Sequence, residues 1–217
     1  MSKITVWGRK SSVNVQSVLW CLEELGLDYE RFDAGYNYGV VNTPAFLEMN
    51  PNGKVPVLID GDGTTIFESG AILRYLATQY SGGSFWPDSP VERADVDKWA
   101  EWAKINFAHN FISNVFWPLV RVPPSQRDYS AITEALVLIE KELVVADKIL
   151  AANAFLAGND FTLADIQLGH CLHRYFDIDV VRADLPHLKA YYLNLQTRPG
   201  FSHHVMVSYD ELRVTTG

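Results

Sequence analysis

Two adjacent serines stand in a short polar turn near the start of the chain, between an apolar run and an amphipathic pattern. The stretch "GRKSSVNVQ" places Ser11, Ser12 and Asn14 where a strand would pass into a helix. Such side chains can cap a helix. They can also hold a reactive group at the helix N-terminus, where unpaired backbone N–H groups favour negative charge. Both uses stay open on these residues alone.

A proline opens an apolar run further along the chain, in "NGKVPVL". Proline cannot donate to a strand ladder, so Pro56 belongs at a sheet edge or at the first residue of a strand. A proline that joins a loop to a strand is also a candidate for a cis peptide bond. A cis bond would turn the backbone of Val55 outward, where it could pair with an extended peptide; a trans proline is the alternative.

An acid and a hydroxyl stand together at the expected start of a helix, in "FESGAI". Exposed N–H groups at a helix N-terminus attract a carboxylate, and the Ser69 hydroxyl adds one more donor. Glu68 can accept from an ammonium group. The pair therefore suits an α-amino acid head group, unless Ser69 is a simple N-cap and Glu68 a first-turn acid.

The apolar periodicity of the first 80 residues predicts the elements that position these side chains. Residues 3–7 favour a strand, and residues 14–25 carry apolar side chains three and four apart, as one face of a helix does. A second strand in residues 27–35 implies a parallel strand–helix–strand unit. After a polar, turn-rich connection, a hairpin around "GDG" and a helix in residues 68–80 complete a four-stranded mixed sheet with helices.

The pattern changes after "SGGSFWPDSP", a segment rich in glycine, serine and proline that is typical of a linker. From residue 91 to about residue 198 the apolar residues follow helical spacing, with almost no strand signals. We therefore predict an α/β domain in residues 1–80, a linker in 81–90 and an all-helical domain in 91–217. Within the helical part, Thr162 and Asp165 of "FTLADI" fit a capping box, which is a folding signal.

Composition narrows the classes of function. The 217 residues carry a net charge of −8, which argues against a non-specific nucleic-acid binder. Cys21 and Cys171 lie in apolar helical patterns and are expected as free buried thiols. We see no secretory signal and no run long enough to span a bilayer, so a reducing cytoplasm is expected.

The histidines carry little chemistry on their own. His170 and His173 have the spacing of metal ligands, but no obvious third ligand accompanies them, so no metal is expected. His203 and His204 are expected in a solvated terminal turn.

Together the motifs resemble the cytosolic glutathione transferase family. The resemblance is carried by the Ser12 turn, "NPNGKVPVL", "ESGAILRYLA" and "FTLADI", in that order, and the terminal "TRPGFSHHVMV" is similar to bacterial members. It covers essentially the whole chain. It implies a thioredoxin-like N-terminal domain, an all-α helical-bundle C-terminal domain and, usually, a homodimer.

The resemblance also implies which residues bind glutathione. Val55 and Pro56 match the family's valine and cis-proline, which bind the cysteinyl backbone. Glu68 and Ser69 match the pair that binds the γ-glutamyl head group. Lys54 matches a position that often contacts the glycyl carboxylate or the peptide backbone.

The resemblance leaves more than one candidate for the residue that contacts the glutathione thiol. The spacing from Ser12 to Val18 resembles the serine classes (theta, phi and zeta), in which that serine faces the thiol. The same turn is similar to the Thr-x-Asn turn of nu-type members, which can reduce small disulfides, so Ser11 and Asn14 stay as competing contacts. Two features depart from other classes. Trp7 stands near the position where alpha, mu and pi members use tyrosine, and the turn has no cysteine, which disfavours omega and beta types.

The sequence thus predicts a cytoplasmic glutathione transferase of the detoxification kind, with glutathione as co-substrate and no tightly bound cofactor. The thiol would attack a small hydrophobic electrophile. A glutathione-dependent disulfide reductase or peroxidase, or a non-catalytic binding or regulatory protein of the same fold, are the alternatives. No nucleic-acid or membrane partner is expected. The second substrate is expected in a cleft between the domains, with these candidate walls: Trp7, Phe107, Asn110 and Trp117.

Overall fold

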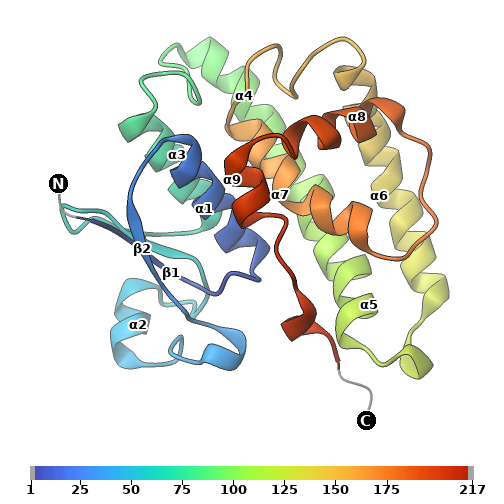
Figure 1. The fold of residues 1–217 in the computed structure, drawn as a ribbon, viewed down its shortest axis with the longest axis horizontal. Coiled ribbons are helices and arrows are strands. Elements are labelled where there is room, and N and C mark those ends of the chain that lie inside the picture. The colour runs from blue at the N-terminus through green and yellow to red at the C-terminus, as the bar shows by residue number, and fades with distance from the viewer. Residues whose placement is uncertain (1–2, 215–217) are drawn as a thin grey trace. The chain divides into compact units, whose positions relative to one another are not determined.

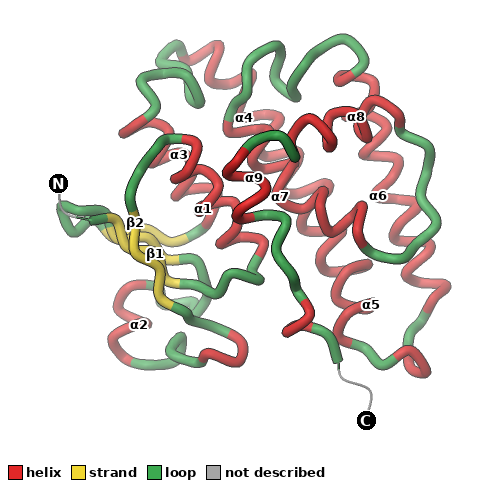
Figure 2. The backbone as a smooth tube through the Cα atoms, viewed as in Figure 1, coloured by secondary structure: helices red, strands yellow, loops and turns green. Residues whose placement is uncertain are grey.

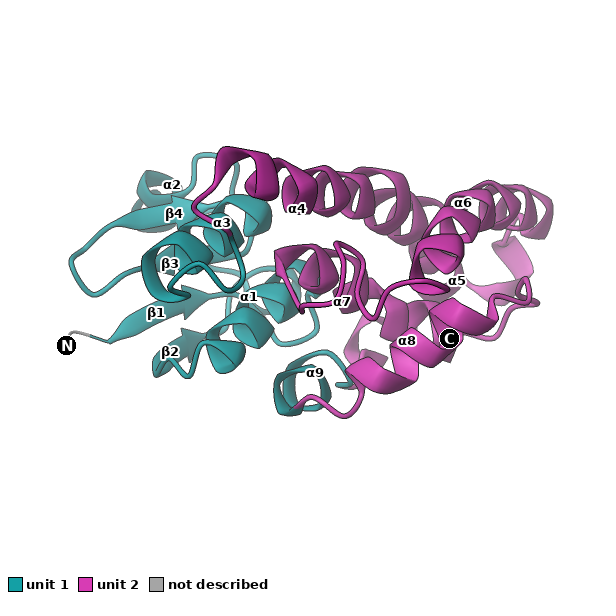
Figure 3. Ribbon diagram, turned by 90° about the horizontal axis from the view of Figure 1, so that it is seen from above, with its two compact units in different colours: residues 1–86, 199–207 teal, residues 87–198, 208–217 magenta. Residues whose placement is uncertain are grey.

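The computed structural model describes residues 3–214, which divide into two compact units (Figure 3). Unit 1 runs to Trp86 and also includes Pro199–Val207. Unit 2 comprises Pro87–Arg198 and the residues from Ser208 onward. The break at Trp86 falls inside the predicted linker, whereas the return of Pro199–Val207 to unit 1 differs from the predicted helical domain of residues 91–217. Residues 1–2 and 215–217, the ends of the predicted domains, lie outside the described residues.

Unit 1 is built on a four-stranded mixed sheet (its strands are yellow in Figure 2) with the strand order β2-β1-β3-β4, labelled in Figure 3. β1 pairs parallel with β2, and β3 runs antiparallel to both β1 and β4. This topology confirms the predicted strand–helix–strand unit followed by a hairpin. The strands are β1 Ile4–Trp7, β2 Tyr29–Phe32, β3 Val57–Ile59 and β4 Thr65–Phe67.

The two long helices of unit 1 were predicted within a residue, and a shorter one was missed. α1 covers Val13–Glu24 and α3 covers Ser69–Tyr80, whereas α2, Pro44–Met49, lies in the segment predicted as a turn-rich connection. Thr43 caps α2 by accepting from the N–H of Phe46 at 3.3 Å, and Pro44 opens its first turn. Both are ordinary helix-start signals, but six residues are too few for an apolar period to show.

The last helix of unit 1, α9 Pro199–His204, packs on α1, although almost the whole helical unit separates the two in sequence (Figure 1). The ring of Phe201 meets Trp20 edge to face, with centroids 5.0 Å apart. A Cβ added to Gly200 would lie 2.7 Å from Trp20 Cδ1, so glycine allows this close approach. His203 is exposed, as predicted, but the pair ends a helix instead of a free turn, and His203 Nδ1 and His204 Nε2 contact the Glu23 carboxylate at 2.8 and 2.7 Å.

Unit 2 is helical, as predicted, and the part that the structure describes has no strand beyond one isolated bridge, Phe155–Gly158. Two π-helical stretches join α4 to α5, so the chain stays helical between Pro90 and Arg121. The helices are α4 Pro90–Trp102, α5 Trp117–Arg121, α6 Tyr129–Leu150, α7 Leu163–Asp177 and α8 Pro186–Leu195. Short 3₁₀ turns cover Tyr36–Tyr38, Pro124–Gln126 and Asp210–Leu212.

The predicted capping box at the start of α7 is present and does more than cap a helix. The Asp165 carboxylate is completely buried and accepts from the N–H of Thr162 at 2.8 Å, which is the capping bond. It also accepts from the N–H of Leu156 at 2.9 Å and from the Tyr191 hydroxyl of α8 at 2.8 Å. One buried carboxylate therefore ties the preceding loop, α7 and α8 together.

Both cysteines are free and buried, as predicted. Burial raises the pKa of the Cys171 thiol to about 12, and burial together with Glu24 raises the pKa of Cys21 well above its usual value. Neither thiol is therefore a nucleophile near neutral pH. In residues 3–214 no helix is both long and apolar enough to cross a membrane.

Candidate active site

The sheet register gathers the predicted binding residues at one end of unit 1. Trp7 at the end of β1 pairs with Val57 at the start of β3, and Val57 pairs with Phe67 at the end of β4. The segments that lie just beyond this row are residues 8–12, 55–56 and 68–69. Motifs that are far apart in sequence thus come together at the same end of the sheet.

Ser12 stands directly before α1 and does not use its hydroxyl as a cap. Its backbone is extended, with φ −85° and ψ 119°, as expected for an N-cap residue, but its side chain makes no capping hydrogen bond. Ser12 is 8% exposed and Ser11 is 3% exposed. Asn14 is exposed in the first turn of α1. The Ser12 hydroxyl is therefore not used to cap α1.

Gly8, the first residue of this turn, allows the turn to pack directly on the loop that precedes β3. Its φ of 154° is one that other residues rarely adopt. A Cβ at Gly8 would lie 2.4 Å from Cγ2 of Val15 and 3.2 Å from Cβ of Val55. The serine turn and Val55 thus share one compact region.

We expect Gly8→Ala to lower the free energy of unfolding by at least about 2 kcal/mol, because it combines backbone strain with a steric clash. Urea unfolding followed by circular dichroism measures the change. Gly26→Ala is the matched control, since Gly26 also has positive φ, 63°, but an added Cβ would meet nothing within 4 Å. Equal losses in the two variants would show that the packing against Val15 and Val55 contributes nothing.

The Val55–Pro56 peptide bond is cis, as predicted. Pro56 is buried, whereas Val55 is partly exposed and Lys54 is exposed. The loop before them is held by Asn50, which is 3% exposed and donates from Nδ2 to the Lys54 carbonyl at 2.7 Å. Asn50 is not among the site residues predicted from the sequence. The residue type was a usable signal, because asparagine side chains commonly accept from the backbone two residues further on in a turn. Here the Asn52 N–H donates to the Asn50 side chain at 3.0 Å.

At the start of α3, the alternative in which Ser69 is the N-cap and Glu68 a first-turn acid is wrong. Glu68, not Ser69, occupies the N-cap position, and the Glu68 side chain makes no capping bond. Glu68 has a φ of 69°, which is uncommon for a residue other than glycine and costs on the order of 1 kcal/mol. Ser69 is 4% exposed in the first turn. Such backbone strain is concentrated at functional sites, and the first turn of α3 offers N–H donors to a carboxylate.

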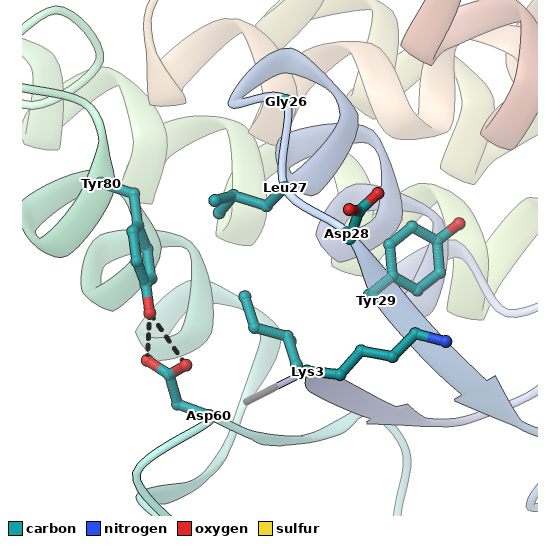
Figure 4. Close-up of a pocket in the computed structure, with 8 residues that line it drawn as sticks. Lys3, Gly26, Leu27, Asp28, Tyr29, Asp60 and Tyr80 are labelled. Carbon is teal, nitrogen blue, oxygen red and sulfur yellow. Dashed lines mark hydrogen bonds between the residues drawn. The ribbon is translucent and has the colours of Figure 1, made fainter. Parts of the chain in front are cut away.

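The opposite end of the sheet holds a cavity of about 700 Å³ that contains none of these residues (Figure 4). Its most buried polar group is Asp60, which accepts from the hydroxyls of Tyr75 at 2.5 Å and Tyr80 at 2.6 Å and from the Gly61 N–H at 2.6 Å. Burial opposes ionisation of Asp60, but these hydrogen bonds together hold its pKa below the usual value. Asp60 therefore connects β3 to α3, and both of its carboxylate oxygens already accept hydrogen bonds from the protein.

The candidate walls for a second substrate divide between the two units. In unit 1, Trp7 stacks on Phe32 with centroids 4.9 Å apart and packs against the core around Phe46 and Val57. In unit 2, Phe107 has no exposed surface and stacks on Phe111 at 5.6 Å. Phe107 is therefore a core side chain, because the helical spacing that selected it also selects core aromatics.

The other two candidates lie nearer the surface of unit 2. Asn110 lines a hollow of about 290 Å³ between the π-helical segment and α6, and its Nδ2 donates to the Asn106 carbonyl at 3.2 Å. Trp117 lies under the guanidinium of Arg121, which is 3.7 Å from the ring centroid. Within residues 3–214 no group of three or more histidine, cysteine or acidic side chains could hold a metal.

Comparison with known proteins agrees with the geometry of both units. Residues 2–78 match the model of the glutathione S-transferase N-terminal domain, and residues 108–199 match that of the C-terminal domain. The chain is 38% identical to glutathione S-transferase GstB of Escherichia coli over 205 residues, covering 94% of this chain and 98% of the relative. It is 34% identical to glutathione S-transferase 3 of Zea mays over 211 residues, covering 94% of each.

A solved structure shares the whole fold at a comparable level of identity. The theta class glutathione S-transferase of Xanthomonas axonopodis pv. citri with glutathione bound is 41% identical, with a TM-score of 0.89, covering 96% of this chain and 99% of that one. The two matched domains, the sheet order and this likeness along almost the full length lead to one conclusion: the chain belongs to the glutathione S-transferase family.

Proposed function

We propose that this chain is a glutathione transferase that activates the glutathione thiol for attack on a small hydrophobic electrophile. One observation carries the proposal. The Ser12 hydroxyl, the cis Val55–Pro56 bond and the Glu68–Ser69 pair lie beyond a single row of paired residues at one end of the sheet. The family membership supports it, and a relative 41% identical has been solved with glutathione bound.

Each part of glutathione has a chemically matched place in this arrangement. The α-carboxylate of the γ-glutamyl group would accept from Ser69 and the first turn of α3, and its ammonium would face Glu68. The cysteinyl N–H and C=O would pair with the backbone of Val55, beside Pro56. The exposed ammonium of Lys54 suits the glycyl carboxylate. These contacts leave the sulfur at the Ser12 turn, between the two anchored ends.

The turn can supply enough free energy to ionise the thiol. A cysteine-like thiol has a pKa of about 8.5, and lowering that value by two units needs roughly 2.7 kcal/mol of preferential thiolate stabilisation. A hydrogen bond to a charged group contributes about 1.5–3 kcal/mol, and a helix N-terminus adds about 0.3–1 kcal/mol. One hydroxyl together with the N-terminus of α1 is therefore sufficient. Ser12 donates its hydrogen bond to the sulfur and never needs to ionise.

The reaction that follows is a displacement at carbon. The thiolate forms a sulfur–carbon bond with the electrophile while the leaving group departs with its electron pair. No protein thiol takes part in this reaction, since Cys21 and Cys171 are buried. Glutathione is a co-substrate here, and the scheme uses no tightly bound cofactor.

The proposal includes a homodimer in the cytoplasm. Four apolar side chains of unit 2 are exposed in this structure, and a partner protomer could cover them. They are Ile105, Val137, Leu138 and Val145, with exposures of 56%, 48%, 61% and 41%. A reducing compartment suits a reaction that consumes reduced glutathione. Light scattering of the purified protein gives the molar mass in solution and tests the dimer.

Retention on immobilised glutathione, followed by assays with an aryl halide and with a small disulfide, tests the function. We expect retention, elution by free glutathione and conjugation of the aryl halide. Turnover of the disulfide alone would instead identify a glutathione-dependent reductase, consistent with the exposed Asn14 beside the serine turn. Retention with neither activity would identify a binding protein, and no retention would overturn the site.

A further inference from the structure

The turn between β1 and α1 is held by side chains that come from outside it. The backbone N–H groups of Gly8 and Arg9 continue the pairing with β2, donating to the carbonyls of Phe32 at 2.8 Å and Ala34 at 3.2 Å. The three carbonyls of residues 8–10 accept from groups other than the backbone N–H groups of β2. Within the turn, only the Arg9 carbonyl has a backbone partner, the Ser12 N–H at 3.2 Å.

Arg31 of β2 supplies the donor for the first of these carbonyls. Its Nη1 donates to the Gly8 carbonyl at 2.7 Å. The guanidinium is held in place by Asp33, whose carboxylate oxygens lie 2.5 Å from Nη1 and 3.2 Å from Nη2. The Arg31 side chain is only 15% exposed, so this two-pronged ion pair is partly desolvated. Arg31 thus fixes the point where the turn leaves the sheet.

Gln16 of α1 supplies the donor for the last carbonyl. It is 1% exposed, and its Nε2 donates to the Lys10 carbonyl at 2.9 Å. Its other amide atom, Oε1, is buried and has no hydrogen-bond partner within the described part of the chain. A buried amide oxygen without a partner is destabilising, and an apolar side chain at this position would avoid that cost. Stability alone therefore does not account for a glutamine here.

We infer that Arg31 and Gln16 are positioning residues, which clamp the Gly8–Lys10 turn from both ends so that Ser12 and the N-terminus of α1 face the glutathione sulfur. The inference rests on the proposed function. Neither side chain contacts glutathione in this arrangement, since both donate to backbone carbonyls of the turn. Their effect on the sulfur is transmitted through the turn, which ends at the two serines.

The expected effect follows from the geometry of a charge-assisted hydrogen bond. Such a bond weakens steeply when the donor moves or tilts, and misplacements near 1 Å can cost up to about a hundredfold in rate. A looser turn would leave glutathione bound by Val55, Glu68 and Ser69 but would stabilise its thiolate less well. Affinity and thiol ionisation should therefore separate.

The test compares Gln16→Met and Arg31→Met with the unaltered protein. The ultraviolet absorbance of the thiolate is titrated against pH with glutathione bound. We expect the apparent pKa of the bound thiol to rise by about one unit in each variant, which lowers kcat/KM about tenfold below that pKa. The KM for glutathione should stay within about twofold. Arg31→Lys, which keeps one donor for the Gly8 carbonyl, should recover part of the loss.

Gln167→Met is the matched control, because Gln167 is also 1% exposed, with its Nε2 buried and unpaired in the described residues, but lies in α7 of unit 2. It should leave the thiol pKa unchanged, and thermal unfolding monitors the folding of every variant. Unchanged thiol pKa values in both methionine variants at positions 16 and 31 would overturn the inference. An absence of any thiolate signal in the unaltered protein would instead overturn the proposed function.

Discussion

Ser12→Ala is expected to raise the pKa of glutathione bound to the protein by about one to two units, since the sulfur loses a hydrogen bond worth about 1.5–3 kcal/mol. Thiolate would become roughly ten- to a hundredfold scarcer near neutral pH, and kcat/KM for an aryl halide should fall in proportion. The KM for glutathione should change little, because the residues proposed to hold its ends are untouched. Titration of thiolate absorbance and steady-state rates measure both quantities.

Ser11→Ala and Asn14→Ala complete the experiment, since both residues compete for the same role. The Ser12 hydroxyl makes no capping bond, and Ser12 is less deeply buried than Ser11, at 8% against 3% exposed. We therefore expect Ser11→Ala to have a much smaller effect on the thiol pKa. A larger effect at Ser11 or Asn14 would move the thiol contact to that residue, and equal, negligible effects would remove Ser12 from the active site.

Asp165→Ala is expected to have the largest effect on folding. The substitution leaves the buried N–H groups of Leu156 and Thr162 and the Tyr191 hydroxyl without their acceptor. At about 1–3 kcal/mol for each buried group, the loss should be at least about 3 kcal/mol. Since whole proteins are stable by only about 5–15 kcal/mol, the variant should unfold at a much lower urea concentration or fail to accumulate.

Two controls separate this network from the removal of any acid or any single bond. Asp147→Ala removes a carboxylate of unit 2 that accepts from one backbone group, the Leu188 N–H at 2.8 Å, and should cost about 1 kcal/mol. Tyr191→Phe deletes one donor and keeps the ring, so it should cost far less than Asp165→Ala. Comparable losses in all three variants would contradict the idea that Asp165 organises the loop, α7 and α8 together.

The elements that follow from local pattern were predictable, and those that depend on distant contacts were not. α1 and α3 carry strong apolar periods, and Asp62–Gly63 signals the hairpin between β3 and β4, so all three were predicted. α2 is too short for periodicity. α9 joins unit 1 through contacts with distant residues, such as the fit of Phe201 and Gly200 against Trp20, and the sequence between them gives no sign of these contacts.

The site divides in the same way. Pro56, Glu68 and Ser69 stand in short motifs whose neighbouring residues indicate their roles. The cis bond and the start of α3 were predicted from these motifs. The positive φ of Glu68 could not be anticipated, because acidic residues seldom adopt it. Arg31 and Gln16 were missed since an arginine in a strand and a glutamine in a helix are unremarkable until their carbonyl partners in the turn are known.

The assignment of α9 to unit 1 has a consequence for how the chain can be made. Residues 199–207 complete the packing on α1, yet a ribosome releases them only after nearly all of unit 2 has been synthesised. Domains usually fold as they emerge, N-terminal first, but here the packing on α1 stays incomplete until α9 has been made. During that interval Trp20 lacks the Phe201 ring that packs on it. A fragment that ends in the linker should therefore resemble a stalled nascent chain, with an apolar face available to chaperones.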